Sequence, residues 1–566
     1  MSIWRSISSL LKRMPAAEAR IVARQRLVLA GSLGMAFFIL IAMQVVSLAM
    51  VEARAGGYRL SGDDNPLRGK VYDRKGRVLA TSLPAFMLYA DPAEVMNPYE
   101  ATLQLAELLP GLTEEEIFAK LTQKGRFSEI SWKVSPATYA KTLKAGIVGV
   151  YGRKRITRFY PHRQEAAHIL GAVNKDNIGI AGIEAGMQDR LIRGEDVHLS
   201  IDIAIQSILR HEITEQITKF EAIGGAGVVM DVETGEIIAM VSLPDYDANY
   251  LADASPDSLF NRATKGVYEL GSTFKIFNTA MAVDSGVFSL DDMIDVVSPL
   301  RVGRFPIRDF HPEKTPLNVA EVMVVSSNKG SARIADTLGP QLQQRYINAL
   351  GLTSPLPLEI PEVAAPIVPS RWKRAEVMTI SYGHGLSVTP THLAAAIATT
   401  IGDGTRVVPS LVKGGAASPI SEEVFSEKTV RQIRPIMRRV VTHPRGTGKK
   451  ADARGYSVGG KTGTSEKIST TGGYSRKANI ASFVGAFPSH APRYVVMVMV
   501  DEPKGQKFSF NYATGGWVAA PAVGRFINRA APMLDVAPVN EKSPEIRQIL
   551  MVNLPQLDME VKNASY

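Results

Sequence analysis

The sequence contains no cysteine, and this absence removes several kinds of chemistry at once. Disulfide frameworks, thiolate nucleophiles and cysteine-ligated zinc sites are all excluded. Histidine is also sparse, with nine residues in 566, and the close pairs His162/His168 and His384/His392 lack the i, i+4 spacing that aims two imidazoles at one metal from a helix. We therefore expect neither a metal nor a cofactor.

Charge is also limited, because only 21% of the residues are charged and 65 basic against 55 acidic residues give a net charge of +10. Half of this excess lies in residues 1–26, where six basic residues accompany one acidic residue. The run from Leu27 to Val51 then contains no charged residue. As a helix it is long enough to cross a hydrocarbon core of ~30 Å, so the sequence predicts a single transmembrane helix at 27–51.

The charges that flank this run predict its orientation. Short basic sequence stays on the cytoplasmic side, so we expect a cytoplasmic tail at 1–26 and a periplasmic remainder on a bacterial inner membrane. A cleaved signal peptide is the alternative, because Ala53-Arg54-Ala55 has the small-x-small form, but the run exceeds a signal core of about 7–15 residues. The remaining mild basic excess fits an anionic membrane surface or a cell-wall polymer and does not indicate nucleic acid.

Residues 52–205 have the pattern of a mixed α/β domain, called the pedestal below. Alternation around Asp73–Gly76 predicts a hairpin, and residues 99–143 are leucine-rich with helical spacing. Strand-like stretches lie near 158–161 and 179–184, and a helix is expected at 203–220. We place the domain boundary at 205/206.

Residues 206–535 predict a second, α+β domain. A hairpin is expected at 224–242, strands at 480–487 and 494–500, and a helix at 518–534. Strands at both ends of the domain indicate one sheet that is completed by early and late segments. Residues 536–566 are polar and interrupted by proline, so we expect a loose C-terminal tail.

Ser272 and Lys275 form the first of three short strings that could carry chemistry. Apolar residues follow at helical spacing, so both side chains should lie near a helix start, about one turn apart on the same face. A serine hydroxyl needs a base, and a buried lysine with a lowered pKa can act as one. Taken alone, such a string more often marks a capping serine followed by a solvated lysine.

Ser326 and Asn328 form the second string. An apolar run precedes them and could carry them into a cleft. There the hydroxyl could relay a proton to a leaving amine, and the amide could hold a peptide substrate. As an isolated string, Ser-x-Asn carries almost no information, so its value depends on the strings on either side.

The third string, Lys461 to Thr464, reads Lys-Thr-Gly-Thr and precedes strand-like sequence. We expect an edge strand in which Gly463 lets a substrate backbone approach closely. Lys461 and Thr462 would bind a terminal carboxylate. The backbone N–H groups of Ser272 and Thr464 would together stabilise an oxyanion.

An alternative interpretation makes the chain a nucleotidase. The string from Gly455 to Thr462 satisfies the phosphate-binding pattern G-x-x-x-x-G-K-[ST], and Val495 to Asp501 resembles an apolar strand that ends in a metal-binding aspartate. A phosphate loop must follow a strand and open a helix. This string instead follows a basic stretch and continues into Gly/Thr/Ser-rich sequence, so the acyl-transfer interpretation is favoured.

The three strings in this order resemble the motifs of the class B penicillin-binding proteins, which are monofunctional peptidoglycan transpeptidases. The resemblance covers nearly the whole chain, because the pedestal motifs of the family are matched by Arg68–Gly76, Arg158–Pro161 and Gly179–Glu184. Within the family the chain is most similar to division-specific members. Asn328 stands where elongation-type relatives usually carry Asp, and Ser381–Pro390 also matches.

The resemblance implies a serine β-lactamase-like fold for 206–535, with a central antiparallel sheet and helices on both faces. It implies that Ser272 attacks the D-Ala-D-Ala bond of a stem peptide, that Lys275 is the general base, and that β-lactams acylate Ser272. The implied site comprises catalytic Ser272, Lys275, Ser326, Asn328 and Lys461, and substrate-binding Thr462, Gly463 and Thr464.

The expected partners also follow from the resemblance. They are stem peptides of lipid II-derived glycan, β-lactams, a polytopic FtsW-type glycosyltransferase and other division proteins at the septum. Three alternatives stay open: an elongation-type transpeptidase, a D,D-carboxypeptidase or β-lactamase-like hydrolase, and a non-catalytic scaffold. The extra module at 52–205 argues against a small hydrolase, and a buried lysine base argues against a scaffold, since binding alone needs none.

Overall fold

The computed structural model describes residues 31–32, 34–39, 41–44, 67–303, 305–415, 422–468 and 474–564. The chain divides into two compact units, Met1–Asn65 and Pro66–Tyr566. In the first unit, the described residues are helical and exposed. The predicted tail at 1–26 and most of the predicted membrane segment at 27–51 fall outside the described residues. No helix within the described ranges is long and apolar enough to span a bilayer, so the transmembrane helix stays a prediction.

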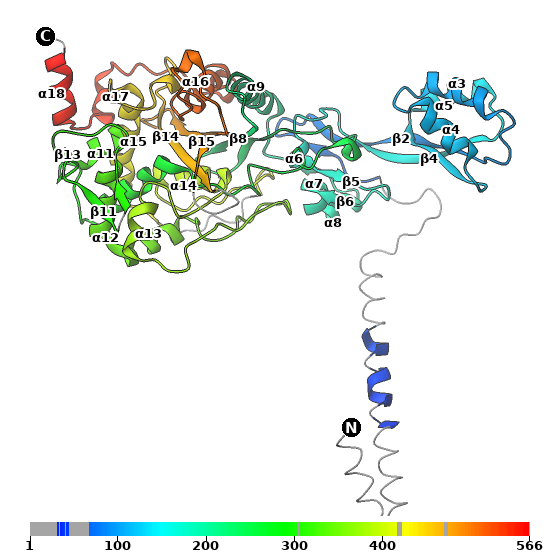
Figure 1. Cartoon of the computed structure of the whole chain (residues 1–566), viewed down its shortest axis with the longest axis horizontal. Coiled ribbons are helices and arrows are strands. Elements are labelled where there is room, and N and C mark those ends of the chain that lie inside the picture. The colour runs from blue at the N-terminus through cyan, green and yellow to red at the C-terminus, as the bar shows by residue number, and fades with distance from the viewer. Residues whose placement is uncertain are drawn as a thin grey trace, which may run out of the picture. The chain divides into compact units, whose positions relative to one another are not determined.

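A five-stranded sheet organises the pedestal (Figure 1). Its strands are β1 (Val71–Tyr72), β2 (Val78–Ala90), β3 (Ser128–Val134), β4 (Val150–Phe159) and β7 (Val197–His198). The long strand β2 pairs antiparallel with β1, β3 and β4, while β1 pairs in parallel with β7. Asp73 closes the turn between β1 and β2 by accepting the backbone N–H groups of Lys75 and Arg77, which confirms the predicted hairpin.

Three capped helices gather at one end of β2 and β4 (Figure 1). They are α3 (Pro98–Leu108), α4 (Glu114–Thr122) and α5 (Pro136–Ala145). The side chains of Asn97, Thr113 and Ser135 accept backbone N–H groups in their first turns, as N-caps do. The prediction of helix across 99–143 is therefore right for these segments and wrong for 128–134. There Ser128 and Ile130 are buried and alternate with partly buried neighbours in the strand β3.

Buried charge joins the pedestal motifs around Glu184. One carboxylate oxygen of Glu184 accepts Arg68 Nε at 2.6 Å, and the other accepts Arg158 Nε at 2.6 Å. All three side chains are almost completely shielded from solvent. Short elements frame this cluster: α6 (Ala167–Leu170), β5 (Ala172–Val173), β6 (Gly179–Ala181), α7 (Gly182–Gly186) and α8 (Gln188–Ile192). The three motifs far apart in the sequence thus meet at one carboxylate.

The second domain is built on an antiparallel sheet in the order β14-β15-β16-β8-β9 (Figure 1). The strands are β14 (Gly459–Ile468), β15 (Tyr474–Phe487), β16 (Tyr494–Asp501), β8 (Gly224–Asp231) and β9 (Ile237–Leu243). Every residue of the central strand β16 is buried, as its uninterrupted apolar sequence requires for a strand covered on both faces. The predicted hairpin at 224–242 and the late strands are confirmed, and β14 is an edge strand.

Helices cover both faces of this sheet, as predicted. On one face, α9 (Ile203–Lys219) and α16 (Ala519–Ala530) share a core with β8, β9 and β16. On the other, α10 (Lys275–Asp284), α14 (Pro390–Ile401) and α15 (Glu427–Thr442) share a larger core. Asp202 caps α9 through the N–H of Ala204. The proposed domain boundary at 205/206 remains a prediction.

The expectation of a loose tail after 535 is wrong. The helices α17 (Pro544–Ile549) and α18 (Pro555–Ala564) follow there, and Leu554 and Leu557 are fully buried in the larger core. Each of these two leucines, removed from water, stabilises the docked segment by roughly 2 kcal/mol. The segment is therefore part of the folded domain.

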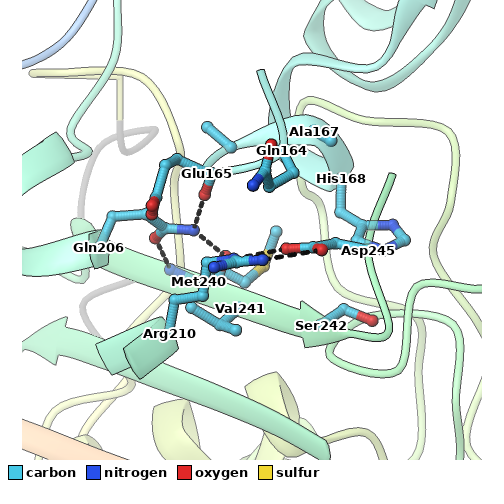
Figure 2. Close-up of a pocket in the computed structure, with 11 residues that line it drawn as sticks. Gln164, Glu165, Ala167, His168, Gln206, Arg210, Met240, Val241, Ser242 and Asp245 are labelled. Carbon is cyan, nitrogen blue, oxygen red and sulfur yellow. Dashed lines mark hydrogen bonds and ion pairs between the residues drawn. The ribbon is translucent and has the colours of Figure 1, made fainter. Parts of the chain in front are cut away.

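The pedestal meets the second domain at a polar seam beside α9 (Figure 2). Gln206 Nε2 donates to the carbonyl oxygens of Glu165 and Met240, both at 2.8 Å, and Gln206 Oε1 accepts the Met240 N–H. One turn later, Arg210 forms a bidentate ion pair with Asp245. These contacts tie the pedestal segment at 165 to both α9 and β9.

Candidate active site

Ser272 lies in a 3₁₀ turn, Gly271–Phe274, that leads directly into α10. Lys275 is the first residue of α10, and its Nζ lies 3.0 Å from Ser272 Oγ. Phe274 and Phe277 are buried beside the pair and pack edge to face. The i, i+3 geometry expected from the sequence is thus present, with the lysine inside the protein rather than solvated.

Ser326 ends the short helix α11 (Val319–Val325) in a left-handed conformation with φ 67°. This conformation is unusual for a residue with a side chain and is typical of functional sites. It presents both Ser326 oxygens to Lys275 Nζ, the carbonyl at 2.6 Å and the hydroxyl at 3.1 Å. Asn328, at the start of α12 (Asn328–Ala349), adds its Oδ1 at 2.7 Å.

Lys461 reaches the same hydroxyl from the edge strand β14. Its Nζ lies 2.9 Å from Ser326 Oγ, and its side chain is completely buried. Ser326 Oγ therefore stands between two amines, one from α10 and one from β14. Ser272, Lys275, Ser326 and Lys461 form a continuous chain of hydrogen-bonding groups between α10 and β14.

Burial sets the protonation of the two lysines. Desolvation, then repulsion from Lys461, holds the pKa of Lys275 well below its usual value, although the Asp309 carboxylate opposes this shift. Desolvation also lowers the pKa of Lys461 to about 7. Near neutral pH, Lys275 can therefore be a free amine that accepts a proton, and Lys461 can exchange one.

The rest of the third string shapes the strand that faces Ser272. Thr462 Oγ1 donates to Thr447 Oγ1 at 2.7 Å, and Thr464 Oγ1 accepts the N–H of Gly515 at 3.1 Å. A Cβ on Gly463 would lie 2.3 Å from both the Leu270 carbonyl oxygen and Ser482 Oγ. Only glycine fits there, because the backbone just before Ser272 packs directly against the strand.

The proposed oxyanion donors are close in the fold. Gly271 has φ +56°, and a Cβ on it would lie 3.1 Å from the backbone nitrogen of Thr464. Gly383 packs on the same backbone, since a Cβ there would lie 2.0 Å from the Gly271 carbonyl oxygen. The turn that carries Ser272 is thus clamped between β14 and the Gly383 loop, with the two expected N–H groups on neighbouring segments.

Sequence reasoning missed Asp309 and Thr447. Asp309 accepts Ser327 Oγ at 2.9 Å and the backbone N–H groups of Asn328 and Lys329, so it fixes the second string from a separate loop. Thr447 fixes the third string through Thr462. Neither belongs to a motif, and contacts of this range have no local pattern that could have pointed to them.

The phosphate-loop alternative does not match the fold. Lys461 and Thr462 lie inside strand β14, and the chain continues along that strand to Ile468 rather than opening a helix. Lys461 Nζ points to Ser326 rather than to an open loop. Among the residues that the structure describes, no group of His, Asp or Glu side chains could hold a metal ion.

Two family models match the chain. Residues 63–199 match the penicillin-binding protein dimerisation domain, and residues 225–528 match the penicillin-binding protein transpeptidase domain. A probable peptidoglycan D,D-transpeptidase FtsI of Caulobacter vibrioides is 38% identical over 504 residues, which cover 85% of this chain and 84% of that protein. The peptidoglycan D,D-transpeptidase FtsI of Escherichia coli K12 is 30% identical, with coverage of 83% and 84%.

Solved structures show the same fold. Penicillin-binding protein 3 of Mycobacterium tuberculosis, solved with aztreonam, aligns with a TM-score of 0.67 at 22% identity over 84% of this chain and 98% of that chain. The transpeptidase domain of Burkholderia pseudomallei penicillin-binding protein 3 aligns with a TM-score of 0.54 at 33% identity over 60% of this chain and 98% of that one. With the pedestal and the catalytic domain both matched, the chain belongs to the class B penicillin-binding proteins.

Proposed function

We propose that the chain is a D,D-transpeptidase that cross-links peptidoglycan stem peptides through an acyl-enzyme on Ser272. The observation that carries this function is the chain of groups across the cleft: Ser272 Oγ lies 3.0 Å from a buried amine, and Ser326 Oγ links that amine to Lys461. A buried amine beside a hydroxyl is the arrangement that serine acyl transfer needs.

In the first half-reaction, the neutral amine of Lys275 takes the proton of Ser272 as Oγ bonds to the carbonyl carbon of the D-Ala-D-Ala peptide. The peptide C–N bond then breaks, and the leaving amine of the terminal D-Ala takes a proton. Ser326 and Lys461 form the route for that proton, because Ser326 Oγ lies within hydrogen-bond distance of both amines. The Ser272 and Thr464 N–H groups bind the oxygen that becomes negative.

In the second half-reaction, an amine of another stem peptide attacks the ester carbonyl. The acceptor amine gives a proton to Lys275, the ester C–O bond breaks, Ser272 Oγ takes that proton back from Lys275, and the new peptide bond is the cross-link. Thr462 and Thr464 hold the substrate along β14, and Asn328 holds it from the opposite wall. A β-lactam uses only the first half, because its leaving amine stays tethered after the ring opens.

Labelling with fluorescent penicillin tests the assignment of the nucleophile. Ser272→Ala should abolish labelling while the protein remains folded, and labelling of that variant on another serine would exclude the proposed role. A second assay separates transfer from hydrolysis. Lipid II-derived glycan with an acceptor amine should yield cross-linked dimers, whereas release of D-Ala without dimers would make the chain a carboxypeptidase.

We also propose where the enzyme works. The apolar run at 27–51 and its basic flank support a single-pass inner-membrane protein with the catalytic domain in the periplasm. The similarity to FtsI relatives supports action at the division septum with an FtsW-type glycosyltransferase, which supplies the glycan strands. A fluorescent fusion expressed in place of the native protein should concentrate at midcell, and side-wall localisation would indicate an elongation enzyme instead.

A further inference from the structure

The short helix α11 connects the catalytic cleft to a distant part of the chain. Its last turn ends in Ser326, and its first turn is closed by a capping box. The backbone N–H of Glu321 donates to Asn318 Oδ1 at 2.8 Å, and the backbone N–H of Asn318 donates to Glu321 Oε2 at 2.9 Å. The helix is only seven residues long, or roughly 10 Å. Its N-terminal attachment therefore limits how far Ser326 can move.

That attachment is made by residues 551–561, which we call the arm. Glu321 Oε1 accepts the backbone N–H groups of Gln556 at 2.7 Å and Leu557 at 3.1 Å. Asn318 Nδ2 donates to the Asn553 carbonyl at 3.1 Å. Glu321 is completely buried, so one carboxylate caps α11 with one oxygen and holds the arm with the other.

Arg445 attaches the arm a second time. Its guanidinium pairs with Glu560 of the arm at 2.5 Å and with both oxygens of Glu313 at 2.7 and 2.8 Å. The Glu313 side chain is almost completely buried. Arg445 thus joins the arm, the loop 308–316 and the loop that follows α15.

Both of those loops reach the catalytic residues. Asp309, four residues before Glu313, binds the backbone of Asn328 and Lys329. Thr447, two residues after Arg445, accepts the hydroxyl of Thr462 on β14. The Arg445 guanidinium is therefore linked through short loop segments to two walls of the site, the start of α12 at Asn328 and strand β14 at Thr462.

We propose that the arm is a clasp for the catalytic cleft, with Arg445 as the positioning residue that holds the two walls at the distance acyl transfer requires. The proposal rests on the proposed function, because it concerns the geometry of the same acylation. Removing the Arg445 guanidinium would release both loops from their shared attachment, the loop that carries Asp309 and the loop that carries Thr447. Since a displacement of about 1 Å near reacting groups can cost up to about a hundredfold in rate, the effect should fall on the chemical step.

The test measures β-lactam acylation by the full-length protein in detergent, separating the initial binding constant from the acylation rate constant. Arg445→Met should lower the rate constant about tenfold per folded molecule while the binding constant changes less than about twofold. Arg445→Lys, which keeps the cation, should recover much of that loss. Arg431→Met is the matched control, because Arg431 pairs with Glu427 on the exposed side of α15, and it should change neither constant.

Glu560→Gln covers the case in which Arg445→Met does not fold. It removes only the negative charge that pairs Arg445 with the arm and leaves the pairing of Arg445 with Glu313, so a smaller loss of about threefold in the acylation rate constant is expected. The proposal is overturned if the folded variants acylate at the wild-type rate, or if lysine at 445 behaves like methionine. Either result would leave the proposed role of Ser272 standing. If Ser272 is not the nucleophile, the penicillin-labelling experiment with Ser272→Ala would show it.

Discussion

The pedestal and the catalytic domain each bury a cluster of ionisable side chains. Only the pedestal cluster contains opposite charges that pair with each other. In the pedestal, two guanidiniums share the Glu184 carboxylate, with one oxygen for each. In the catalytic domain, Lys275 and Lys461 share only the neutral hydroxyl of Ser326. Among the described residues, neither lysine forms an ion pair with a carboxylate.

The comparison teaches how burial can serve either structure or reactivity. A buried charge with a good counter-ion stays charged and fixes its surroundings, and removing the partner is costly. A buried amine without one loses its proton easily, as the lowered pKa values of Lys275 and Lys461 show. The same desolvation therefore makes the pedestal rigid and the cleft reactive.

Replacing Lys275 by alanine should break the reactive cluster completely. Because it removes the amine that we propose takes the Ser272 proton, acylation by fluorescent penicillin should fall by up to about 10⁴-fold. Lys265→Ala, an exposed lysine ten residues away, should acylate normally. Comparable acylation by the two variants would mean that Lys275 is not the base.

Glu184→Gln should break the structural cluster instead. It leaves two buried guanidiniums without a counter-charge, so the free energy of unfolding in urea should fall by about 3–5 kcal/mol. The exposed Glu215, paired with Lys219, offers Glu215→Gln as a control with little effect. The protein that remains folded should still acylate at its normal rate. A large loss in that rate would show that the two clusters are not independent.

The pH dependence of stability should sharpen the contrast. The pKa of Lys461 is about 7 in the folded protein, against an ordinary value of 10.5. Between these values the unfolded chain binds more protons, so stability should rise with pH, by at most about 1.4 kcal/mol per pH unit from this lysine. Below pH 7 both states bind this proton, so the destabilisation from this lysine has reached its full value and no longer changes with pH. Urea unfolding from pH 7.5 to 9.5 should show a smaller slope for Lys461→Met, and an unchanged slope would contradict the lowered pKa.

Thr462→Val should slow acylation far less than Lys275→Ala. It removes one hydroxyl that donates to Thr447 and, in our proposal, helps bind the substrate carboxylate. The loss of about 1.5–3 kcal/mol corresponds to roughly a ten- to hundredfold slower acylation. Thr462→Ser keeps the hydroxyl and should stay close to wild type. Detectable binding of Mg-ATP by the wild-type protein would instead revive the nucleotidase interpretation.

The sequence predicted the parts of the site that depend on local geometry. Ser272 and Lys275 are three residues apart at a helix start, so their contact follows from helix periodicity alone. The alternating and apolar stretches likewise predicted β8, β9, β15 and β16. By contrast, β3 was missed because its seven residues lie between the two short helices α4 and α5.

The contacts that hold the strings together could not be predicted in this way. Asp309, Thr447 and Arg445 lie in loops, and each meets partners more than a dozen residues away. The arm was taken for a loose tail because the sequence after 535 has many polar residues and several prolines, although Leu554 and Leu557 are buried in the folded protein. Their burial depends on a surface formed by the rest of the domain, which only the folded structure reveals.

The tight packing of Gly463 bears on how this enzyme could escape its inhibitors. A side chain at 463 would collide with the Leu270 carbonyl oxygen, two residues before Ser272, and would push the nucleophile away from β14. Such a change would harm the reaction with stem peptides as much as the reaction with β-lactams. Resistance by target alteration should therefore arise at positions that only the drug touches, and this glycine should stay fixed while those positions vary.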